Sequence, residues 1–179
     1  PEQYEEMKKF IEEGRWHIAG SSWEASDVLV PSVEASIRNI MLGQTYYRQE
    51  FGKEGTDIFL PDCFGFGWTL PTIAAHCGLI GFSSQKLDWR NHPFYGKSKH
   101  PFTIGLWKGI DGKQVMLAHG YDYGRKWNNE DLSKNKDLEK LAQRTPLNTV
   151  YRYYGTGDIG GSPTLGSVRS VEPVSYTHL

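Results

Sequence analysis

The sequence has few of the features that mark disulfide-rich or membrane-embedded proteins. It contains only two cysteines, Cys63 and Cys77, without a Cys-x-x-Cys pair, so no disulfide framework is predicted. We find no apolar run long enough to span a bilayer and no signal peptide. Lysine and arginine number 20 and aspartate and glutamate 21, and this balance gives no indication of nucleic acid or an anionic membrane as a partner. Internal repeats and low-complexity linkers are also missing.

What the chain does have is length and aromatic side chains. Its 179 residues predict one domain that is long enough to bury a hydrophobic core. Aromatic residues make up 13% of the sequence. Their faces can cover the apolar faces of sugar rings, although aromatic residues more often pack in cores or at their rims. The composition is therefore compatible with a neutral polar ligand such as a sugar, but does not require one.

The order of the expected elements favours an α/β fold. Helices are expected where apolar residues recur with a helical period: 4–14, 32–52, about 70–78 and 131–144. In the second helix, the expected apolar face consists of Val33, Ile37, Ile40, Met41 and Tyr47. Strands are expected at 16–19, 57–62, 81–86, 102–108, 114–118 and 148–154, with a hairpin turn at Asp111-Gly112. Strands separated by helices predict a mostly parallel sheet, open or closed into a barrel.

Reactive side chains follow three of these strands, where an α/β fold gathers its chemistry. Asp62 lies between an apolar strand and the glycines of 65–67, and Lys86 ends the next strand. Asp158 lies among four glycines in 154–163, where the backbone can approach a ligand closely. Each also has an ordinary structural interpretation: a capping aspartate, a solvated surface lysine and an irregular turn. Neither Gly-Lys-Ser/Thr nor Gly-x-Gly-x-x-Gly spacing is present to support a phosphate site.

Two carboxylates at different strand ends of one barrel are what glycoside hydrolysis needs. One attacks or stabilises the anomeric carbon, and the other exchanges a proton with the leaving oxygen. We expect Asp62 and Asp158 to face one cleft with their carboxyls roughly 5–5.5 Å apart, the separation typical of a retaining mechanism. The six histidines have no His-x-His, His-x-Asp or His-Glu-x-x-His spacing, so they are interpreted as structural or surface residues.

A longer pattern, from residue 1 to about Glu172, resembles the bacterial α-mannosidases of glycoside hydrolase family 38. Its ordered parts are Gly14-Arg15-Trp16, Trp23-Glu24, Asp27, Glu34, Arg38-Asn39, Pro61-Asp62-Cys63-Phe64-Gly65-Phe66-Gly67, Leu70-Pro71, His76-Cys77-Gly78-Leu79, Gly81-Phe82, Gln85-Lys86-Leu87, Trp89, Gly109-Ile110-Asp111-Gly112 and 155–164. The resemblance implies a retaining, zinc-dependent α-mannosidase that hydrolyses terminal α-mannosides of a mannose-containing oligosaccharide or glycan. It also implies that residues 1–172 are part of a catalytic domain folded as an irregular seven-stranded β/α barrel. Residues 173–179 look like a non-native, adapter-derived tail.

The same resemblance assigns roles to four residues. Asp62 is expected to be the nucleophile and a Zn²⁺ ligand, and Asp158 the general acid/base. Phe64 is expected beside the metal and the sugar, and Lys86 is expected to reach the nucleophile or a substrate hydroxyl. The family completes its zinc site with a His-x-Asp pair before this segment and a histidine well after it, and neither is present in the sequence. The chain alone is therefore expected to be inactive and metal-poor.

Two other functions remain open at this point. A metal-dependent polysaccharide deacetylase also carries aspartate and histidine on such a barrel, but it needs a pair of histidine ligands in the barrel core. No such pair is visible in the sequence. A sugar-binding barrel without catalytic activity is the other alternative, and the presence of both Asp62 and Asp158 argues against it.

Overall fold

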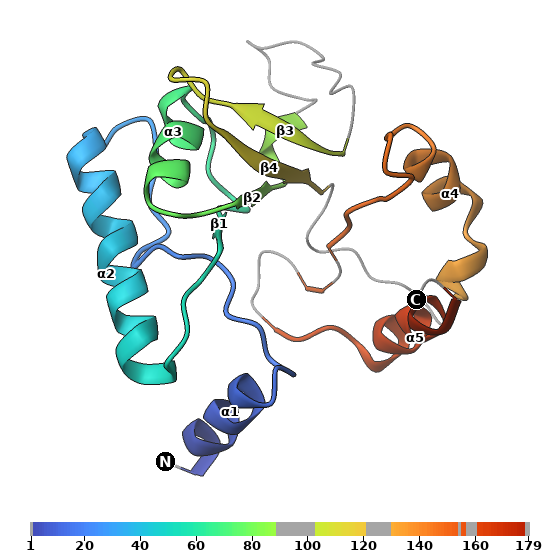
Figure 1. The fold of residues 1–179 in the computed structure, drawn as a ribbon. Coiled ribbons are helices and arrows are strands. Elements are labelled where there is room, and N and C mark those ends of the chain that lie inside the picture. The colour runs from blue at the N-terminus through green and yellow to red at the C-terminus, as the bar shows by residue number, and fades with distance from the viewer. Residues whose placement is uncertain (1, 89–102, 121–129, 154, 157–160, 178–179) are drawn as a thin grey trace. The chain divides into compact units, whose positions relative to one another are not determined.

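The computed structural model describes residues 2–88, 103–120, 130–153, 155–156 and 161–177, and the fold is mixed α/β (Figure 1). Its elements are α1 (Glu2–Glu12), α2 (Val33–Phe51), β1 (Asp57–Phe59), α3 (Thr69–His76), β2 (Gly81–Ser84), η1 (Lys86–Asp88), β3 (Ile104–Lys108), β4 (Gln114–His119), η2 (Leu132–Lys134), α4 (Lys136–Ala142) and α5 (Leu165–Thr177), where η marks a 3₁₀ helix. Among the residues described, no helix combines the length and the apolar character that crossing a bilayer would need.

Four strands of the described ranges form one sheet, in the order β1-β2-β4-β3. β1 and β2 are parallel, with Ile58 opposite Phe82, and α3 connects them as the crossover of a βαβ unit. The turn 109–113 joins β3 to its neighbour β4, and Gly112 adopts a φ of +85° in it. The hairpin predicted from Asp111-Gly112 is thus confirmed, whereas the seven-stranded barrel stays a prediction.

The chain divides into two compact units, and the predicted site residues are shared between them. The first unit consists of residues 1–83 and 106–116, and the second of residues 84–105 and 117–179. Asp62 and Phe64 therefore belong to the first unit, and Lys86 to the second.

The first unit has a hydrophobic core between its helices and its strands. α2 lies beside α3, and the two helices are in contact (Figure 1). The core side chains are at most 6% exposed: Ile40, Ile58, Leu70, Ile73, Ala74, Phe82 and Val115. The rings of Phe66 and Trp107 each pack edge-on against Phe82, with centroids 5.1 Å apart. Since burying each large apolar side chain contributes about 2 kcal/mol, this core fixes β1 and the loop that follows it.

Helix α2 begins and ends at the residues that the sequence predicts. The side chain of Ser32 accepts a hydrogen bond from the Ala35 N–H at 3.1 Å, and Gly52 ends the helix with a φ of +62°. Its buried residues, however, are Ile40, Gly43 and Gln44.

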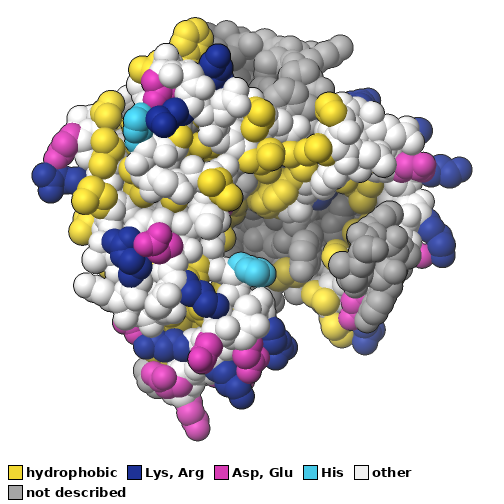
Figure 2. All heavy atoms as spheres, in the orientation of Figure 1, with side chains coloured by type: hydrophobic (Ala, Val, Ile, Leu, Met, Phe, Trp, Pro, Cys, Tyr) yellow, Lys and Arg dark blue, Asp and Glu magenta, His cyan; other side chains and the backbone are white. Residues whose placement is uncertain are grey.

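The apolar face expected on α2 is therefore partly wrong. Val33 and Met41 are 50% and 59% exposed, and Figure 2 shows hydrophobic side chains on the outer surface of this helix. The reason is that Ser21 and Ser22 contact the backbone at Gly43, which turns that side of the helix inward. A hydrophobic pattern cannot reveal such a contact, because no side chain of residue 43 takes part in it.

The strand expected at 16–19 is absent, although the chain there leads directly to β1. Gly20 has a φ of +71°, a left-handed conformation that ends an extended segment. Its N–H donates to the Asp57 Oδ1 at 3.1 Å, and the hydroxyl of Ser21 donates to the carbonyl of Asp57 at 2.8 Å. Side-chain hydrogen bonds thus replace the backbone ladder that a strand would have formed.

In the second unit, the strand expected at 148–154 is also wrong for the residues that are described. Asn148 has a φ of +48°, and Thr149 turns back onto Thr145. The Thr145 hydroxyl accepts the Thr149 N–H at 3.1 Å and donates to the Thr149 carbonyl at 3.0 Å. The helix expected over 131–144 forms in two pieces, η2 and α4, because Asn135 caps α4 by accepting the N–H groups of residues 137 and 138.

Helix α5 was not expected from the sequence. It packs against η2, and the Glu130 N–H donates to the buried hydroxyl of Ser170 at 2.9 Å. The helix continues through Pro173 to Thr177, so part of the segment interpreted as a tail is helical. The non-native origin of that segment stays a prediction.

Candidate active site

The loop that follows β1 carries the predicted nucleophile at the carboxyl end of the strand. Leu60 is 2% exposed and its N–H donates to the Ser83 carbonyl at 3.1 Å, which extends the pairing of β1 with β2. Asp62 comes two residues later in a turn and is exposed, and Phe64 is 60% exposed. Both side chains are therefore presented by a loop whose start is anchored in the core, as the sequence predicts.

Gly65 allows the backbone conformation of this loop. Its φ of +152° is disfavoured for residues with a side chain, and a Cβ atom at this position would lie 2.5 Å from the Leu29 Cδ1. A Cβ at Gly67 would lie 3.7 Å from the other methyl group of Leu29. The glycines that follow Asp62 thus allow the segment 26–29 to pack directly against the loop of residues 60–67. We call it the nucleophile loop, after the predicted role of Asp62.

A hydrogen bond joins the same two segments next to Asp62. The thiol of Cys63 donates to the carbonyl of Ser26 across 3.1 Å. In the neighbouring turn, the Asp27 Oδ1 accepts the Leu29 N–H at 2.8 Å. Residues 26–29 and 62–67 therefore form one structured region, which we call the Asp62 region.

The electrostatics of Cys63 indicate that two carboxylates lie near it. Burial raises the pKa of the Cys63 thiol, and the negative charges of Asp27 and Asp62 raise the pKa further. A thiol with a raised pKa stays protonated at neutral pH and is a poor nucleophile. Cys63 therefore serves this region as a hydrogen-bond donor, and the role of Asp62 as the nucleophile stays a prediction.

Asn39 of α2 holds the segment that packs on the nucleophile loop. Its amide oxygen accepts the Glu24 N–H at 2.8 Å, and its amide nitrogen donates to the Glu24 carbonyl at 2.9 Å and to the Ser26 hydroxyl at 3.2 Å. The Trp23 N–H donates to the backbone carbonyl of Asn39 at 3.0 Å. One helical residue thus makes four hydrogen bonds to residues 23–26.

The entry to β1 is fixed in a similar way. The buried amide of Gln44 donates to the Gly55 carbonyl at 2.7 Å and accepts the Gly55 N–H at 2.9 Å. Burial raises the pKa of Asp57, and the hydrogen bonds from the N–H groups of Gly20 and Asp57 itself act in the opposite direction. These contacts hold the start of β1, and the bonds of Gln44 connect it to α2.

The positions of the other two predicted catalytic or binding side chains relative to Asp62 stay predictions. Lys86 lies in η1, beyond the end of β2, and is half-buried, with its N–H donating to the Ser84 hydroxyl at 3.1 Å. It belongs to the second unit, so its contact with the nucleophile stays a prediction. Asp158 lies outside the described residues, and its separation from Asp62 also stays a prediction.

Metal-binding side chains are scattered in the part of the chain that the structure describes. No group of three histidine, cysteine, aspartate or glutamate side chains there could hold a metal ion. His17 and His76 are exposed and His119 is buried. The remaining histidines, like Asp158, fall outside the described ranges. Asp62 is thus the one ligand that the prediction names.

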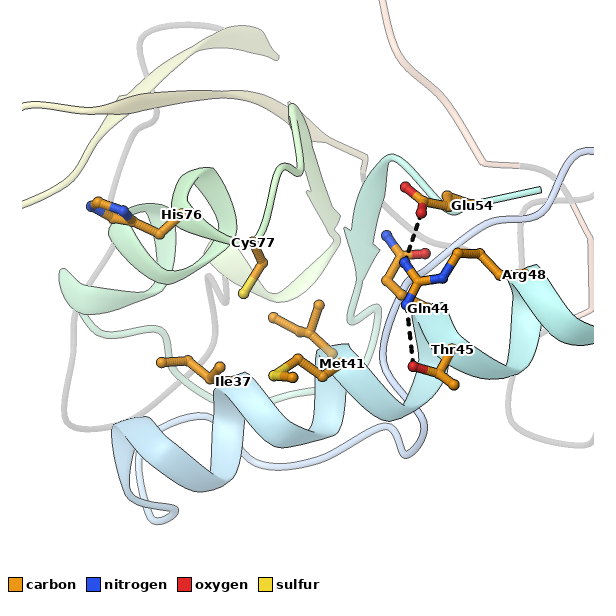
Figure 3. Close-up of a pocket in the computed structure, with 9 residues that line it drawn as sticks. Ile37, Met41, Gln44, Thr45, Arg48, Glu54, His76 and Cys77 are labelled. Atoms are coloured by element: carbon orange, nitrogen blue, oxygen red, sulfur yellow. Dashed lines mark hydrogen bonds and ion pairs between the residues drawn. The ribbon is translucent and has the colours of Figure 1, made fainter. Parts of the chain in front are cut away.

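A cavity of about 250 Å³ lies between α2 and α3 (Figure 3). Its wall combines apolar, polar and charged side chains: Ile37, Ile40, Met41, Gln44, Thr45, Arg48, Glu54, His76 and Cys77. The Arg48 guanidinium is already bound to the Glu54 carboxylate at 2.7 Å and to the Thr45 hydroxyl at 3.2 Å. Because Asp62 and Phe64 are not in its wall, we do not assign the reaction to this cavity.

Asp111 in the turn between β3 and β4 is bound to α3. Its carboxylate accepts the Thr72 hydroxyl at 2.8 Å and the Lys113 N–H at 3.1 Å, and it is hydrogen-bonded to the His76 Nε2 at 2.9 Å. Burial raises the pKa of Asp111, but these hydrogen bonds outweigh it and hold the pKa below its usual range. This cluster fastens the hairpin to α3.

Sequence reasoning identified Asp62 and Phe64 but gave no role to Ser26, Leu29, Asn39 or Cys63. One signal was available for Asn39. Asparagine is disfavoured inside helices because its amide competes for backbone hydrogen bonds, so its position within the apolar period of 32–52 suggested a partner outside the helix. The partner itself could not be named, because it lies 13 to 15 residues earlier in the chain.

Comparison with known proteins agrees with the resemblance of the whole chain to family 38. The sequence profile of the glycosyl hydrolases family 38 N-terminal domain matches residues 1–175. Alpha-mannosidase G of Dictyostelium discoideum is 36% identical over 171 residues, which cover 92% of this chain and 15% of that protein. Alpha-mannosidase 2C1 of Mus musculus is 31% identical over 179 residues, which cover 99% of this chain and 17% of that protein. The chain thus spans about a sixth of the length of these relatives.

A solved structure is similar in fold at lower sequence identity. The crystal structure of an alpha-mannosidase from Enterococcus faecalis V583 superposes on 99% of this chain and 20% of its own, with a TM-score of 0.63 at 16% identity. That likeness concerns the fold alone. The family profile, by contrast, matches nearly the whole chain, and this chain therefore belongs to glycosyl hydrolase family 38 as part of its N-terminal domain.

Proposed function

We propose that this chain forms part of the active site of a retaining, zinc-dependent α-mannosidase, which hydrolyses terminal α-mannosides of glycans. The single observation that carries the proposal is the presentation of Asp62. Its carboxylate is exposed at the carboxyl end of β1, on a loop held by the core and by residues 26–29, within a match to family 38. We propose further that these residues act within a longer chain, in which the sheet belongs to a β/α barrel.

In the proposed reaction, two carboxyl groups exchange roles. The Asp62 carboxylate attacks the anomeric carbon and forms a glycosyl-enzyme ester, while the carboxylic acid of Asp158 protonates the departing glycosidic oxygen. Asp158, now a carboxylate, removes a proton from water, and the hydroxide oxygen displaces Asp62 from the anomeric carbon. Mannose leaves with its original anomeric configuration, and both carboxyl groups return to their starting states.

Phe64 and Lys86 have binding roles in the proposal. Phe64 is 60% exposed beside Asp62 in sequence, and its ring can cover the apolar face of the mannose that Asp62 attacks. Lys86 donates a charged hydrogen bond to a mannose hydroxyl or to the nucleophile. Since both contacts are made to substrate or nucleophile, changing either residue alters KM or kcat without unfolding the domain.

The zinc requirement is proposed for the longer chain, since the residues described here do not fit a complete site. A zinc site needs three or more protein ligands, and the described ranges contain no suitable group of three donors. Asp62 supplies one carboxylate, a ligand type that zinc accepts. We therefore assign no catalytic step to the metal and propose only that Asp62 is one of its ligands.

The test uses a family-length protein that contains this sequence. We expect it to hydrolyse an aryl α-mannoside, to release α-mannose first when the product is followed by NMR, and to lose activity on chelation. Release of acetate from an acetylated polysaccharide, without mannoside hydrolysis, would instead support a deacetylase. Binding of mannosides without hydrolysis would support a sugar-binding barrel. Initial release of β-mannose would refute the retaining mechanism.

A further inference from the structure

The nucleophile loop is supported by a chain of polar contacts that begins on α2. We propose that Asn39 is a positioning residue for Asp62 and acts through Ser26 and Cys63. This inference rests on the proposed role of Asp62 as the nucleophile. It goes beyond that role because it assigns a function in the reaction to a residue of a helix that does not carry the nucleophile.

The first link fixes the backbone of Glu24. The side-chain amide of Asn39 binds both the N–H and the carbonyl of Glu24, at 2.8 and 2.9 Å, as a neighbouring strand would. Two bonds from one planar amide set the orientation of this residue as well as its distance from the helix. The third bond, to the Ser26 hydroxyl at 3.2 Å, extends the support by two residues.

The second link passes from Ser26 to the nucleophile loop. The Ser26 carbonyl accepts the Cys63 thiol at 3.1 Å, so the direction of this carbonyl determines where residue 63 lies. Residue 63 directly follows Asp62. Leu29 also packs against Gly65, but an apolar contact is non-directional and does not fix the orientation of residue 63.

The proposal predicts a loss in kcat with little change in KM. Nucleophilic attack requires the reacting atoms to be aligned, and a displacement of about 1 Å can slow such a step about 100-fold. In Asn39→Ala, all three side-chain bonds are lost. We expect kcat for an aryl α-mannoside to fall about 10- to 100-fold. KM is expected to change less than about threefold, because no substrate-binding group is removed.

A double-mutant cycle tests whether Asn39 acts through Cys63. If both residues belong to one path, Asn39→Ala combined with Cys63→Ala lowers kcat little more than Asn39→Ala alone. The matched control is Asn135→Ala, which removes an asparagine that caps α4 through two side-chain hydrogen bonds, from the N–H groups of residues 137 and 138. Its effect on kcat, if any, is expected to multiply with that of Cys63→Ala.

The measurements are made on the family-length enzyme. Its active sites are counted by titration with a mannoside that traps the glycosyl-enzyme, and each rate is expressed per active site. The rate of Cys63 alkylation, followed by mass spectrometry, reports the contact directly and is expected to rise at least threefold in Asn39→Ala but not in Asn135→Ala. Unchanged kcat and unchanged alkylation in Asn39→Ala would overturn the positioning role, and so would independent effects of Asn39→Ala and Cys63→Ala. An unmutated enzyme without mannosidase activity would instead refute the proposed function.

Discussion

Gly43 lies in the middle of α2, where the backbone of Ser21 and Ser22 contacts the helix. A Cβ atom at residue 43 would lie 2.2 Å from the Ser21 carbonyl oxygen and 2.8 Å from the Ser22 carbonyl carbon. Ordinary contacts of a Cβ begin near 3.4 Å, so Gly43→Ala requires the helix and this segment to separate by about 1 Å. Neither partner can give way by rotating a side chain, because both contacts are made by backbone atoms.

Gly43→Ala has two opposing effects on stability. The cost of the steric overlap with residues 21 and 22 is larger than the gain in helix propensity. Alanine inside a helix is favoured over glycine by about 1 kcal/mol. Overpacking against a backbone costs about 1–3 kcal/mol. The separation also weakens the hydrogen bonds between Asn39 and residues 23–24, each of which contributes about 1 kcal/mol. We therefore expect Gly43→Ala to destabilise the fold by about 2–4 kcal/mol. Replacing a glycine inside a helix with alanine usually has the opposite effect.

Thermal unfolding and hydrogen exchange check this result together. Gly43→Ala is expected to lower the Tm and to speed exchange of the Trp23 and Glu24 amides. The control is Gly52→Ala, where no atom lies within 4 Å of the added Cβ and the φ of +62° is the only obstacle. It is expected to cost about 1–2 kcal/mol without changing exchange at Trp23. A Gly43→Ala protein with an unchanged or higher Tm and normal protection would refute the reasoning.

Four further predictions concern the site, the Asp111 cluster and the chain as a whole. In the family-length enzyme, Asp62→Asn is expected to lower kcat by several orders of magnitude, and a variant with a tenth of the original activity would contradict the assignment. Asp158→Ala is expected to hydrolyse an activated aryl mannoside far better than a disaccharide and to be partly rescued by azide, whereas equal losses without rescue would move the role to another carboxylate. The Asp111 carboxyl is expected to titrate below its usual pKa range by NMR, so its link to α3 contributes stability above the pKa of an unfolded aspartate and loses it as the pH falls through the lowered pKa. Thr72→Val is expected to raise the pKa of Asp111, and an unchanged titration would exclude the hydrogen bond as its cause. Residues 1–179 alone are expected to be inactive and metal-poor after gel filtration, and a monomeric, zinc-loaded, active chain would show that the metal ligands have been misplaced.

The elements that could be predicted are those with local signals. α2 begins after Ser32 and ends at Gly52 because a capping hydroxyl and a left-handed glycine act on neighbouring residues. The hairpin turn at Asp111-Gly112 likewise depends on neighbouring residues only. The position of Asp62 at a strand end also followed from an apolar run and the glycines after it.

The elements that could not be predicted depend on contacts between distant residues. The chain at 16–19 has strand-like composition, but Gly20 ends it and Asp57, 37 residues later, accepts its N–H. Asn148 and Thr149 turn back onto Thr145 where an extended segment was expected. In both places side-chain hydrogen bonds satisfy the backbone, and hydrophobic periodicity carries no information about them. The link from Asn39 to Cys63 escaped prediction for the same reason.

The position of β1 in the sheet explains why so many side chains converge on it. β1 is an edge strand of the described sheet and has only three residues, so pairing with β2 alone gives it few backbone hydrogen bonds. Unpaired groups on an edge strand also invite association with other chains.

Residues 20 and 21 bind the start of this edge strand: the Ser21 hydroxyl donates to the Asp57 carbonyl, and the Asp57 carboxylate accepts the Gly20 N–H. Further along, the Ser26 carbonyl accepts the Cys63 thiol in the loop that follows the strand. The segment 20–26 therefore takes the place of a neighbouring strand while leaving the loop at its end free to present Asp62. Continuous backbone pairing would have extended the strand through residue 62. Successive side chains of a strand point to opposite faces of the sheet, so the position of Asp62 in the strand would then have fixed the direction of its carboxylate. The backbone pairing ends at Leu60, and the hydrogen bond between Cys63 and Ser26 supports the residues that follow. These contacts therefore set the direction of the carboxylate instead.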